Sequence, residues 1–372
     1  MGRSAPLIPG RAATALALGV ALGALGALGC GEPVSILGDT PGLMRIVAGV
    51  PDDAGRDVGN SATETLLWHP AGVDMDLDGV LYLADRDNRR ILAVSSSGAV
   101  RVVVSDLGCA ALCLAEPVAL AVDGAGGLIV ADDRGHRVWR FDAATGARTL
   151  LAGTGESETT PDGEPAATSP IRSPRGVAVD GNGLVYFAEG RSHRVRAILA
   201  DGTLSTAAGT GESGFAGDGG PAAEADIYFP GGIEIANGVL YIADAGNQRV
   251  RAVDLVSGVI STVAGTGASG FSGDGGPALS AALSDPRDVA VASDGLVLYI
   301  ADRGNHRIRA VSLTTSLINT AAGSGDTAFA GNLIDAGAAG LASPIGVATS
   351  PFGLVLIADT DHHIVWRTPT GF

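Results

Sequence analysis

The chain has 372 residues and a formal charge of −16, and 46% of its residues are hydrophobic while only 17% are charged. The apolar content excludes intrinsic disorder, and the acidic balance argues against a nucleic-acid partner, because nucleic-acid binding draws on clustered Lys and Arg. The 56 glycines do not recur at every third residue, which excludes collagen and favours many tight turns between short strands.

The N-terminal residues have the layout of an export signal. Two arginines, Arg3 and Arg11, precede an apolar run over residues 12–29 that ends at Cys30. We therefore expect an exported protein.

Cys30 is the expected site of lipidation. The sequence Ala-Leu-Gly-Cys at residues 27–30 resembles the bacterial lipoprotein signal, in which the cysteine is lipidated, although its leucine stands two rather than three residues before the cysteine. The resemblance implies a lipoprotein-type signal peptide over residues 1–29, a tether over residues 30–42 and a membrane anchor at Cys30 in the cell envelope. An ordinary cleaved signal and an uncleaved anchor are the alternatives.

Two further cysteines, Cys109 and Cys113, stand four residues apart. A helix-like turn between them brings their Cα atoms within disulfide reach, and export places them in a compartment where disulfides persist. We predict that they pair. The alternative, half of a metal site, lacks a nearby histidine or second cysteine pair.

The rest of the chain repeats one unit six times. Each unit opens with Pro-x-Gly-Val or a variant of it, at Pro70, Pro117, Pro174, Pro230, Pro286 and Pro344. An alternating apolar strand, a turn and a second strand follow, and the second strand closes on Asp85, Asp132, Glu189, Asp244, Asp302 or Asp359. A third strand and a fourth strand complete the unit. Four strands per repeat predict the blades of an all-β propeller.

The ends of the chain predict how the ring closes. The sixth unit reaches Phe372 without a fourth strand, whereas a strand-like segment over residues 44–49 precedes the first unit. We therefore predict a six-bladed β-propeller over residues 43–372, in which residues 44–49 supply the missing outer strand of the last blade and remove an open sheet edge.

The repeats resemble a known family. Ala-Asp-Ala-Gly-Asn-Gln-Arg-Val at residues 243–250 and Ala-Asp-Arg-Gly-Asn-His-Arg-Ile at residues 301–308 resemble the NHL repeat, and the likeness extends over residues 44–372. The glycine-rich stretch from Gly209, echoed from Gly265, resembles secreted bacterial members. The resemblance implies a six-bladed propeller with a binding or scaffold role, and it says little about activity because this architecture hosts many functions.

Three acids stand where the other units carry small residues. Asp74 and Glu234 occupy an alanine position on the first strand, which lines the central channel, and Asp288 occupies a glycine position nearer one mouth. A hard cation such as Ca²⁺ placed between such carboxylates would relieve their repulsion, so these three residues are a candidate calcium site. The alternative is that channel water or arginines satisfy them.

Two repeated features favour structural roles. Four histidines, at 136, 193, 306 and 363, stand four residues after the closing acid of their unit, and a repeated position is spread around a ring instead of converging on a metal. We expect the closing acids to accept hydrogen bonds from backbone amides of the following turn and to pair with the arginine five residues later.

The long connections between units lie on the same face as the turns after the closing acids. They carry the acids Asp57, Asp162, Asp218 and Asp274, which we take as a candidate ligand-binding face. The alternative is that the Gly-Asp-Gly-Gly-Pro pieces are rigid turns.

These observations predict a monomeric, lipid-anchored binding or scaffold propeller without catalysis. It would recognise an unknown protein or cell-envelope ligand through its long-loop face. The alternative is a cation-dependent enzyme of lactonase or lyase type, as some similar propellers are, with its site at the channel mouth. Asp74, Glu234 and Asp288 would ligate the metal, but no convincing catalytic base accompanies them.

Overall fold

The structure, a computed structural model, describes residues 42–106 and 113–369. The predicted signal peptide, the predicted lipidation site Cys30, residues 30–41 of the tether and Cys109 lie outside the described residues. Cys113 is held in a disulfide bond, and its pairing with Cys109 stays a prediction. None of the helices in the described ranges has the length and apolar character needed to cross a bilayer.

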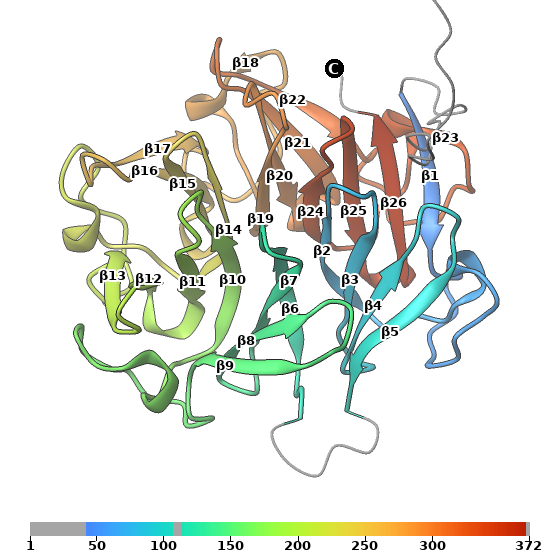
Figure 1. Ribbon diagram of the computed structural model, residues 1–372. Coiled ribbons are helices and arrows are strands. Elements are labelled where there is room, and N and C mark those ends of the chain that lie inside the picture. Colours follow the sequence, from blue (N-terminus) through green and yellow to red (C-terminus); the bar gives the residue numbers. More distant parts are fainter. Residues whose placement is uncertain (1–41, 107–112, 370–372) are drawn as a thin grey trace, which may run out of the picture. The chain divides into compact units, whose positions relative to one another are not determined.

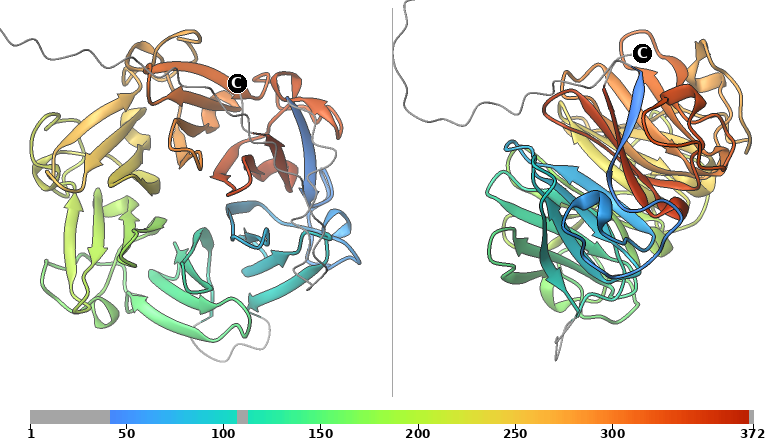
Figure 2. Two further views of the ribbon diagram at one scale, coloured as in Figure 1. Left: turned by 45° about the horizontal axis from the view of Figure 1, so that its top comes forward. Right: turned by 90° about the vertical axis from the view of Figure 1, so that its right-hand side faces the viewer.

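The described residues form six antiparallel blades arranged in a ring, and the first strand of each blade packs beside the first strands of its two neighbours (Figures 1 and 2). Apart from short 3₁₀ helices, the described part of the chain is all β. The predicted six-bladed propeller is therefore confirmed.

The strands of the first three blades run outward from the channel in chain order. Blade 1 contains β2 (Pro70–Met75), β3 (Leu81–Asp85), β4 (Arg90–Val94) and β5 (Val100–Ser105). Blade 2 contains β6 (Pro117–Val122), β7 (Gly127–Asp132), β8 (Arg137–Asp142) and β9 (Arg148–Ala152). Blade 3 contains β10 (Pro174–Val179), β11 (Val185–Glu189), β12 (Arg194–Ile198) and β13 (Leu204–Ala208).

The last three blades follow the same plan. Blade 4 contains β14 (Pro230–Ala236), β15 (Val239–Asp244), β16 (Arg249–Asp254) and β17 (Ile260–Ala264). Blade 5 contains β19 (Pro286–Val291), β20 (Val297–Asp302), β21 (Arg307–Ser312) and β22 (Leu317–Ala322). Blade 6 contains β24 (Pro344–Thr349), β25 (Leu354–Asp359), β26 (Ile364–Pro369) and, from the other end of the described chain, β1 (Leu43–Ala48).

The closure predicted from the two ends is confirmed. Strand β1 pairs antiparallel with β26, with Ile46 opposite Trp366, so blade 6 combines the first and last described strands. Met44 and Ile46 are buried in the hydrophobic cluster between blades 5 and 6. The ring is thus fastened by both strand pairing and apolar packing.

The first strands begin at the six predicted prolines because proline has no N–H for the sheet ladder and is best placed at the first residue of a strand. The glycine two residues later lets neighbouring blades approach closely. A Cβ at Gly176 would lie 2.5 Å from the carbonyl oxygen of Gly231 in the next blade, and a Cβ at Gly232 would overlap the carboxylate of Asp288. Close contact between neighbouring blades therefore explains the glycine of the Pro-x-Gly pattern.

The long connections are built structures that follow the outer strands. Two of them add a two-residue strand to the outer edge of a blade: β18 (Gly276–Pro277) pairs with β22, and β23 (Ile334–Asp335) pairs with β1. Five contain a 3₁₀ helix, namely η1 (Ala62–Glu64), η2 (Ala166–Thr168), η4 (Ala222–Glu224), η6 (Ala278–Ser280) and η8 (Ala336–Ala338). The other 3₁₀ helices form the turns after closing acids: η3 (Gly190–Ser192), η5 (Ala245–Asn247), η7 (Arg303–Asn305) and η9 (Thr360–His362).

The repeated histidines join neighbouring blades. Each has left-handed backbone geometry, and its ring nitrogen Nδ1 accepts a hydrogen bond from the backbone N–H that precedes the first proline of the next blade. The donor–acceptor pairs are Ser173 to His136, Phe229 to His193, Ser343 to His306 and His69 to His363, at 3.1 to 3.3 Å. In blade 4 the side chain of Gln248 accepts the same bond from Asp285, at 2.6 Å. The structural role expected for these histidines is thereby explained.

This contact predicts loss of stability in acid. Nδ1 accepts a bond, so the folded state needs a neutral imidazole, and burial lowers the pKa of His136, His193, His306 and His363. The unfolded chain therefore binds protons more readily, and the stability that these residues contribute above a pH of about 6.5 is lost as the pH falls further.

We expect His193→Gln to have the same melting temperature as the parent at pH 7. When the pH is lowered to about 5, the melting temperature of the variant should fall less than that of the parent. Glutamine supplies the same acceptor without titrating, as Gln248 does in blade 4. Thermal denaturation across this pH range checks the prediction, and equal losses for parent and variant would contradict it.

Candidate functional site

The six closing acids hold each blade together and are not free to act on a ligand. All six are fully buried. Each accepts the backbone N–H two residues before the first proline of its own blade, as in Tyr228 to Asp244 at 2.7 Å and Ala342 to Asp359 at 2.7 Å. These six donors belong to the incoming connection. The predicted acceptance from a backbone amide of the following turn occurs at Asp132, which accepts from Gly135, and in blade 4 the turn contributes the side chain of Asn247 instead.

The predicted pairing with the arginine five residues later needs correction. It occurs in blade 1, between Asp85 and Arg90. In blades 3, 4 and 5 the acid pairs with a fully buried arginine seven residues later, namely Arg196, Arg251 or Arg309. Where both arginines are present, the first one donates instead to a backbone carbonyl oxygen of the connection that leaves the blade, as Arg249 does to Thr266.

Three of the four acids proposed as a ligand-binding face are engaged by the same buried arginines. Asp162 pairs with Arg196 at 3.0 Å, Asp218 with Arg251 at 2.7 Å and Asp274 with Arg309 at 2.6 Å. Each also accepts a hydrogen bond from a threonine on the outer strand of its blade. These carboxylates anchor the long connections along the outer strands, away from the channel. Asp57 is exposed in the connection before blade 1.

The three channel acids do come together. Asp74, Glu234 and Asp288 line one cavity of about 100 Å³ in the central channel, to which the first strands of all six blades contribute. Burial and the charges of Asp74 and Asp288 raise the pKa of Glu234 well above its usual range. Glu234 has no hydrogen-bond partner among the described residues, so its ionised form has little to compensate for desolvation.

Asp74 and Asp288 join adjacent blades. Asp74 accepts the N–H of Met75 at 2.8 Å and that of Val122 in blade 2 at 2.8 Å. Asp288 accepts the N–H of Val289 at 2.9 Å and that of Val347 in blade 6 at 3.0 Å. Burial outweighs these bonds and raises the pKa of Asp74 to about 6 and that of Asp288 to about 7.

Among residues 42–106 and 113–369, no group of three or more His, Cys, Asp or Glu side chains has an arrangement that could hold a metal ion. The oxygens of Asp74 and Asp288 already accept backbone N–H groups. Calcium in the channel stays a prediction.

Replacing Glu234 by glutamine is expected to stabilise the protein at neutral pH. The raised pKa of Glu234 means that its contribution to stability is present below about pH 4.5 and is lost as the pH rises. Glutamine avoids the buried charge, so Glu234→Gln should melt higher than the parent at pH 7 and nearly equally at pH 4. The exposed Glu224→Gln is the matched control, and an equal or lower melting temperature at pH 7 would contradict the prediction.

A second cavity, of about 200 Å³, opens at the mouth of the channel on the face that carries the turns after the closing acids. We call this face the acid-turn face. The residue after the first proline of every blade lines the cavity: Ala71, Val118, Arg175, Gly231, Arg287 and Ile345. Its charged lining residues are Arg86, Glu116, Asp133, Arg175, Arg287, Asp288 and Arg303. Four arginines thus line one cavity of a protein whose net charge is negative.

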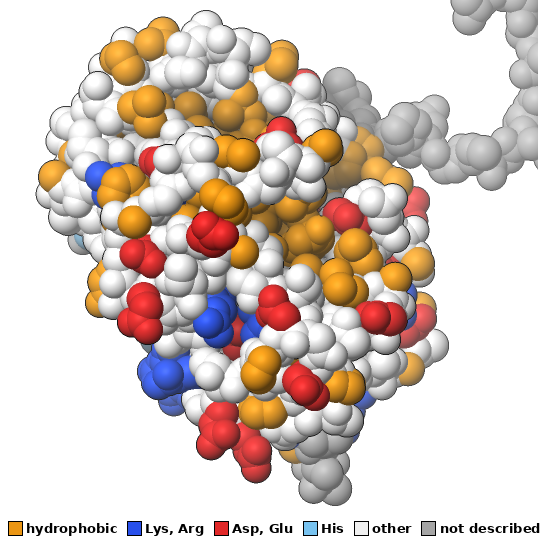
Figure 3. Space-filling view, turned by 90° about the vertical axis from the view of Figure 1, so that its left-hand side faces the viewer, with side chains coloured by type: hydrophobic (Ala, Val, Ile, Leu, Met, Phe, Trp, Pro, Cys, Tyr) orange, Lys and Arg blue, Asp and Glu red, His pale blue; other side chains and the backbone are white. Residues whose placement is uncertain are grey.

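The arginines of the mouth are held in fixed positions. Arg175 pairs with Asp133 at 2.8 Å, and Asp285 pairs with Arg287 at 2.9 Å and with Arg303 at 2.7 Å. Figure 3, in which the left-hand side of Figure 1 faces the viewer, shows arginine side chains in small groups beside carboxylates. The mouth is therefore a polar pocket with defined geometry and not a loose basic patch.

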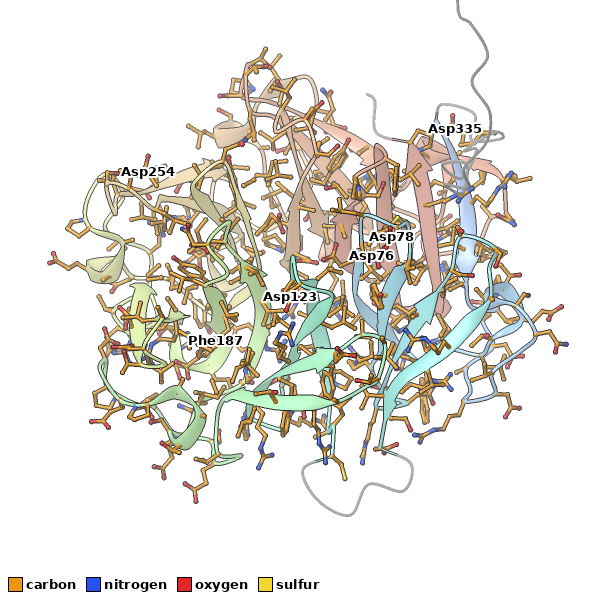
Figure 4. The ribbon with its side chains drawn as sticks, in the orientation of Figure 1. Asp76, Asp78, Asp123, Phe187, Asp254 and Asp335 are labelled. Atoms are coloured by element: carbon orange, nitrogen blue, oxygen red, sulfur yellow. The ribbon has the colours of Figure 1, made fainter. Side chains whose placement is uncertain are left out.

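The opposite mouth carries the hairpins between first and second strands. Asp76 and Asp78 lie on the β2–β3 hairpin and Asp123 on the β6–β7 hairpin (Figure 4). They line a cleft of about 370 Å³ between blades 1 and 2. Asp76 accepts the N–H groups of Asp78 and Val80, and Asp123 pairs with Arg140 at 2.6 Å. These acids shape their own turns.

Sequence reasoning missed the arginine mouth although a usable signal was present. Comparing the six units position by position for acids identified Asp74, Glu234 and Asp288. The same comparison for basic residues finds Arg175 and Arg287 after the first proline, where the other units have apolar residues or glycine.

Known proteins resemble this chain in sequence and in fold. The NHL repeat model matches residues 283–310. NHL repeat-containing protein 2 of Gallus gallus is 33% identical over 153 residues, which is 39% of this chain and 21% of that protein. The matched regions span 17% to 30% of the length of the first curated relatives.

Two solved structures share the fold at low identity. An auxiliary nutrient binding protein from Bacteroides ovatus ATCC 8483 has a TM-score of 0.64 and 17% identity, and the match covers 87% of this chain and 76% of that one. A gluconolactonase from Xanthomonas campestris has a TM-score of 0.57 and 15% identity, covering 88% and 89%. The chain is therefore a six-bladed β-propeller in which residues 283–310 match the NHL repeat.

Proposed function

We propose that the protein is an exported, envelope-anchored binding propeller that holds a small ligand at the channel mouth on its acid-turn face and does not transform it. The observation that carries the proposal is the cavity of about 200 Å³ at this mouth, to which all six blades contribute a residue. Concave sites with a few fixed polar groups are the usual places for small ligands. The likeness to a nutrient binding protein from Bacteroides ovatus is consistent with this role.

The character of the lining favours binding over chemistry. The residues that line the mouth are arginines, carboxylates and small or apolar residues, and the described lining contains no His, Cys, Ser or Tyr side chain. The described lining therefore supplies charge and hydrogen bonds from arginines and carboxylates, without an imidazole, thiol or hydroxyl group.

A thermal-shift screen of the purified full-length protein against small polar metabolites tests the proposal. Ile345→Trp fills the mouth, and Leu77→Trp is the matched control because Leu77 is 81% exposed on the β2–β3 hairpin at the opposite mouth. We expect to find ligands that raise the melting temperature of the parent and of Leu77→Trp but not that of Ile345→Trp. Mass spectrometry should recover these ligands chemically unchanged. Ligands indifferent to Ile345→Trp, no ligands at all, or a converted ligand would contradict the proposal.

The second candidate function is a cation-dependent lactonase or lyase, and Glu234 is the observation that favours it. This carboxylate lies unpartnered among the described residues in the channel, near Asp74 and Asp288. A cation bound there would explain its presence and would polarise a substrate. The gluconolactonase from Xanthomonas campestris shares the fold.

Chelation separates the two candidates. Under the binding proposal, the melting temperature is unchanged by a chelator or by added calcium. A calcium-dependent rise that disappears in Asp74→Ala and Glu234→Ala would favour the enzyme, because an ion that binds only the folded state stabilises it by about 2.7 kcal/mol at a hundredfold excess over its Kd.

A further inference from the structure

The arginine pair at the mouth is arranged around one aromatic ring. The guanidinium carbon of Arg175 lies 4.6 Å from the ring centre of Phe229, and that of Arg287 lies 5.7 Å from it. Phe229 precedes the first strand of blade 4, while the two arginines come from blades 3 and 5. Two cations from different blades are thus held near each other at the edge of one cavity.

The described residues do not use the full hydrogen-bonding capacity of these arginines. A guanidinium has five N–H donors. Arg175 has one ion pair, with Asp133, and its buried Nε has no partner among the described residues. The buried Nε of Arg303, on the same cavity wall, also has none among them. Burial lowers the pKa of Arg175, and the positive charge of Arg287 lowers it further.

The other residues that line the cavity indicate which class of anion it would bind. Ala71, Val118 and Ile345 give the cavity an apolar part, which suits an organic ion better than an inorganic one. Glu116 and Asp288 also line the cavity and would repel a doubly charged ion. The cavity of about 200 Å³ is smaller than the roughly 300–1,000 Å³ usual for small-molecule sites, which limits the ligand to a small one.

We infer that the mouth of the channel binds a small organic monocarboxylate, with its carboxylate group between Arg175 and Arg287 and its body against Ala71, Val118 and Ile345. The planar guanidinium forks match the geometry of a carboxylate. This inference rests on the proposed function and specifies the ligand class for it.

Titration of the full-length protein with sodium salts of aliphatic and hydroxylated monocarboxylic acids of increasing length tests the inference. The neutral amide of each acid, inorganic phosphate and sulfate are included. We expect the carboxylates to bind, Arg175→Gln and Arg287→Gln each to weaken binding at least tenfold, and the amides, phosphate and sulfate to bind more weakly.

Two further variants keep the result interpretable. Arg140→Gln removes an arginine from an ion pair on the β6–β7 hairpin side and is expected to bind like the parent. Arg175→Lys keeps the charge but loses the planar fork, so it should fold normally and bind more weakly than the parent.

The outcomes distinguish this inference from the proposed function. Amides or inorganic ions that bind as well as carboxylates, unchanged binding in both glutamine variants, or no carboxylate binding at all would overturn the inference. If another ligand still depends on Ile345, the proposed function stands. If no ligand depends on Ile345, both fail.

Discussion

Deleting residues 43–48 is expected to produce a protein that aggregates or melts far below the full chain. The deletion exposes the edge of β26 to pairing with other chains and removes Met44 and Ile46 from the core between blades 5 and 6. Burial of each of these side chains contributes about 1.5–3 kcal/mol to the free energy of unfolding, and the loss of the strand pairing adds to this. Thermal denaturation with light scattering measures both effects.

A circular permutant is the matched control. The start of β1 lies beside the end of β26, because Arg45 pairs with Arg367 in an antiparallel register. Residues 50–372, followed by a short glycine-rich linker and residues 43–49, should therefore rebuild blade 6 as a continuous sheet and restore the melting temperature. A deletion variant that melts like the parent would show that the ring does not depend on this strand.

Replacing Asp244 by alanine is expected to cost about 3–5 kcal/mol of unfolding free energy, the usual cost of removing one partner from a buried ion pair. Asp244 accepts hydrogen bonds from the backbone of Tyr228 and the side chain of Asn247, and it pairs with Arg251 at 3.4 Å. Burial raises the pKa of Asp244 to about 6, so the pair itself is not a net source of stability. The loss comes from the buried donors that alanine leaves without an acceptor.

Urea denaturation of two companion variants tests this reasoning. Asp244→Asn retains an acceptor and should cost less than Asp244→Ala. Asp254→Ala changes an exposed residue of the same blade (Figure 4), and it should cost less than about 1 kcal/mol. Equal losses for Asp244→Ala and Asp254→Ala would contradict the assigned role of the buried acid.

The fold could largely be predicted because the same short sequence pattern occurs in six successive units. A single Pro-x-Gly-Val or Ala-Asp segment says little, but in the described structure the first strands begin at the predicted prolines and the second strands end at the predicted acids. The ring closure followed from one further fact, that the last unit lacks a fourth strand while an extra strand precedes the first.

The partners of the side chains were harder to predict than the strands. The residues five and seven after a closing acid lie on the same face of the third strand, so alternation cannot tell which arginine reaches the acid. Arg251 takes this place in blade 4, and Arg249 turns outward over Phe215 at 3.7 Å. The partners of Asp162, Asp218 and Asp274 were also hard to predict, because the long connections that carry these acids fold back onto the outer strands. The role of these acids as a ligand-binding face stays a prediction.

A crystal structure of the full-length protein soaked with the tightest-binding monocarboxylate tests the central claim most directly. The account predicts the ligand at the mouth on the acid-turn face, with its carboxylate within hydrogen-bond distance of Arg175 and Arg287. A ligand seated instead in the cleft near Asp76 and Asp123, or a cation between Asp74, Glu234 and Asp288, would contradict it.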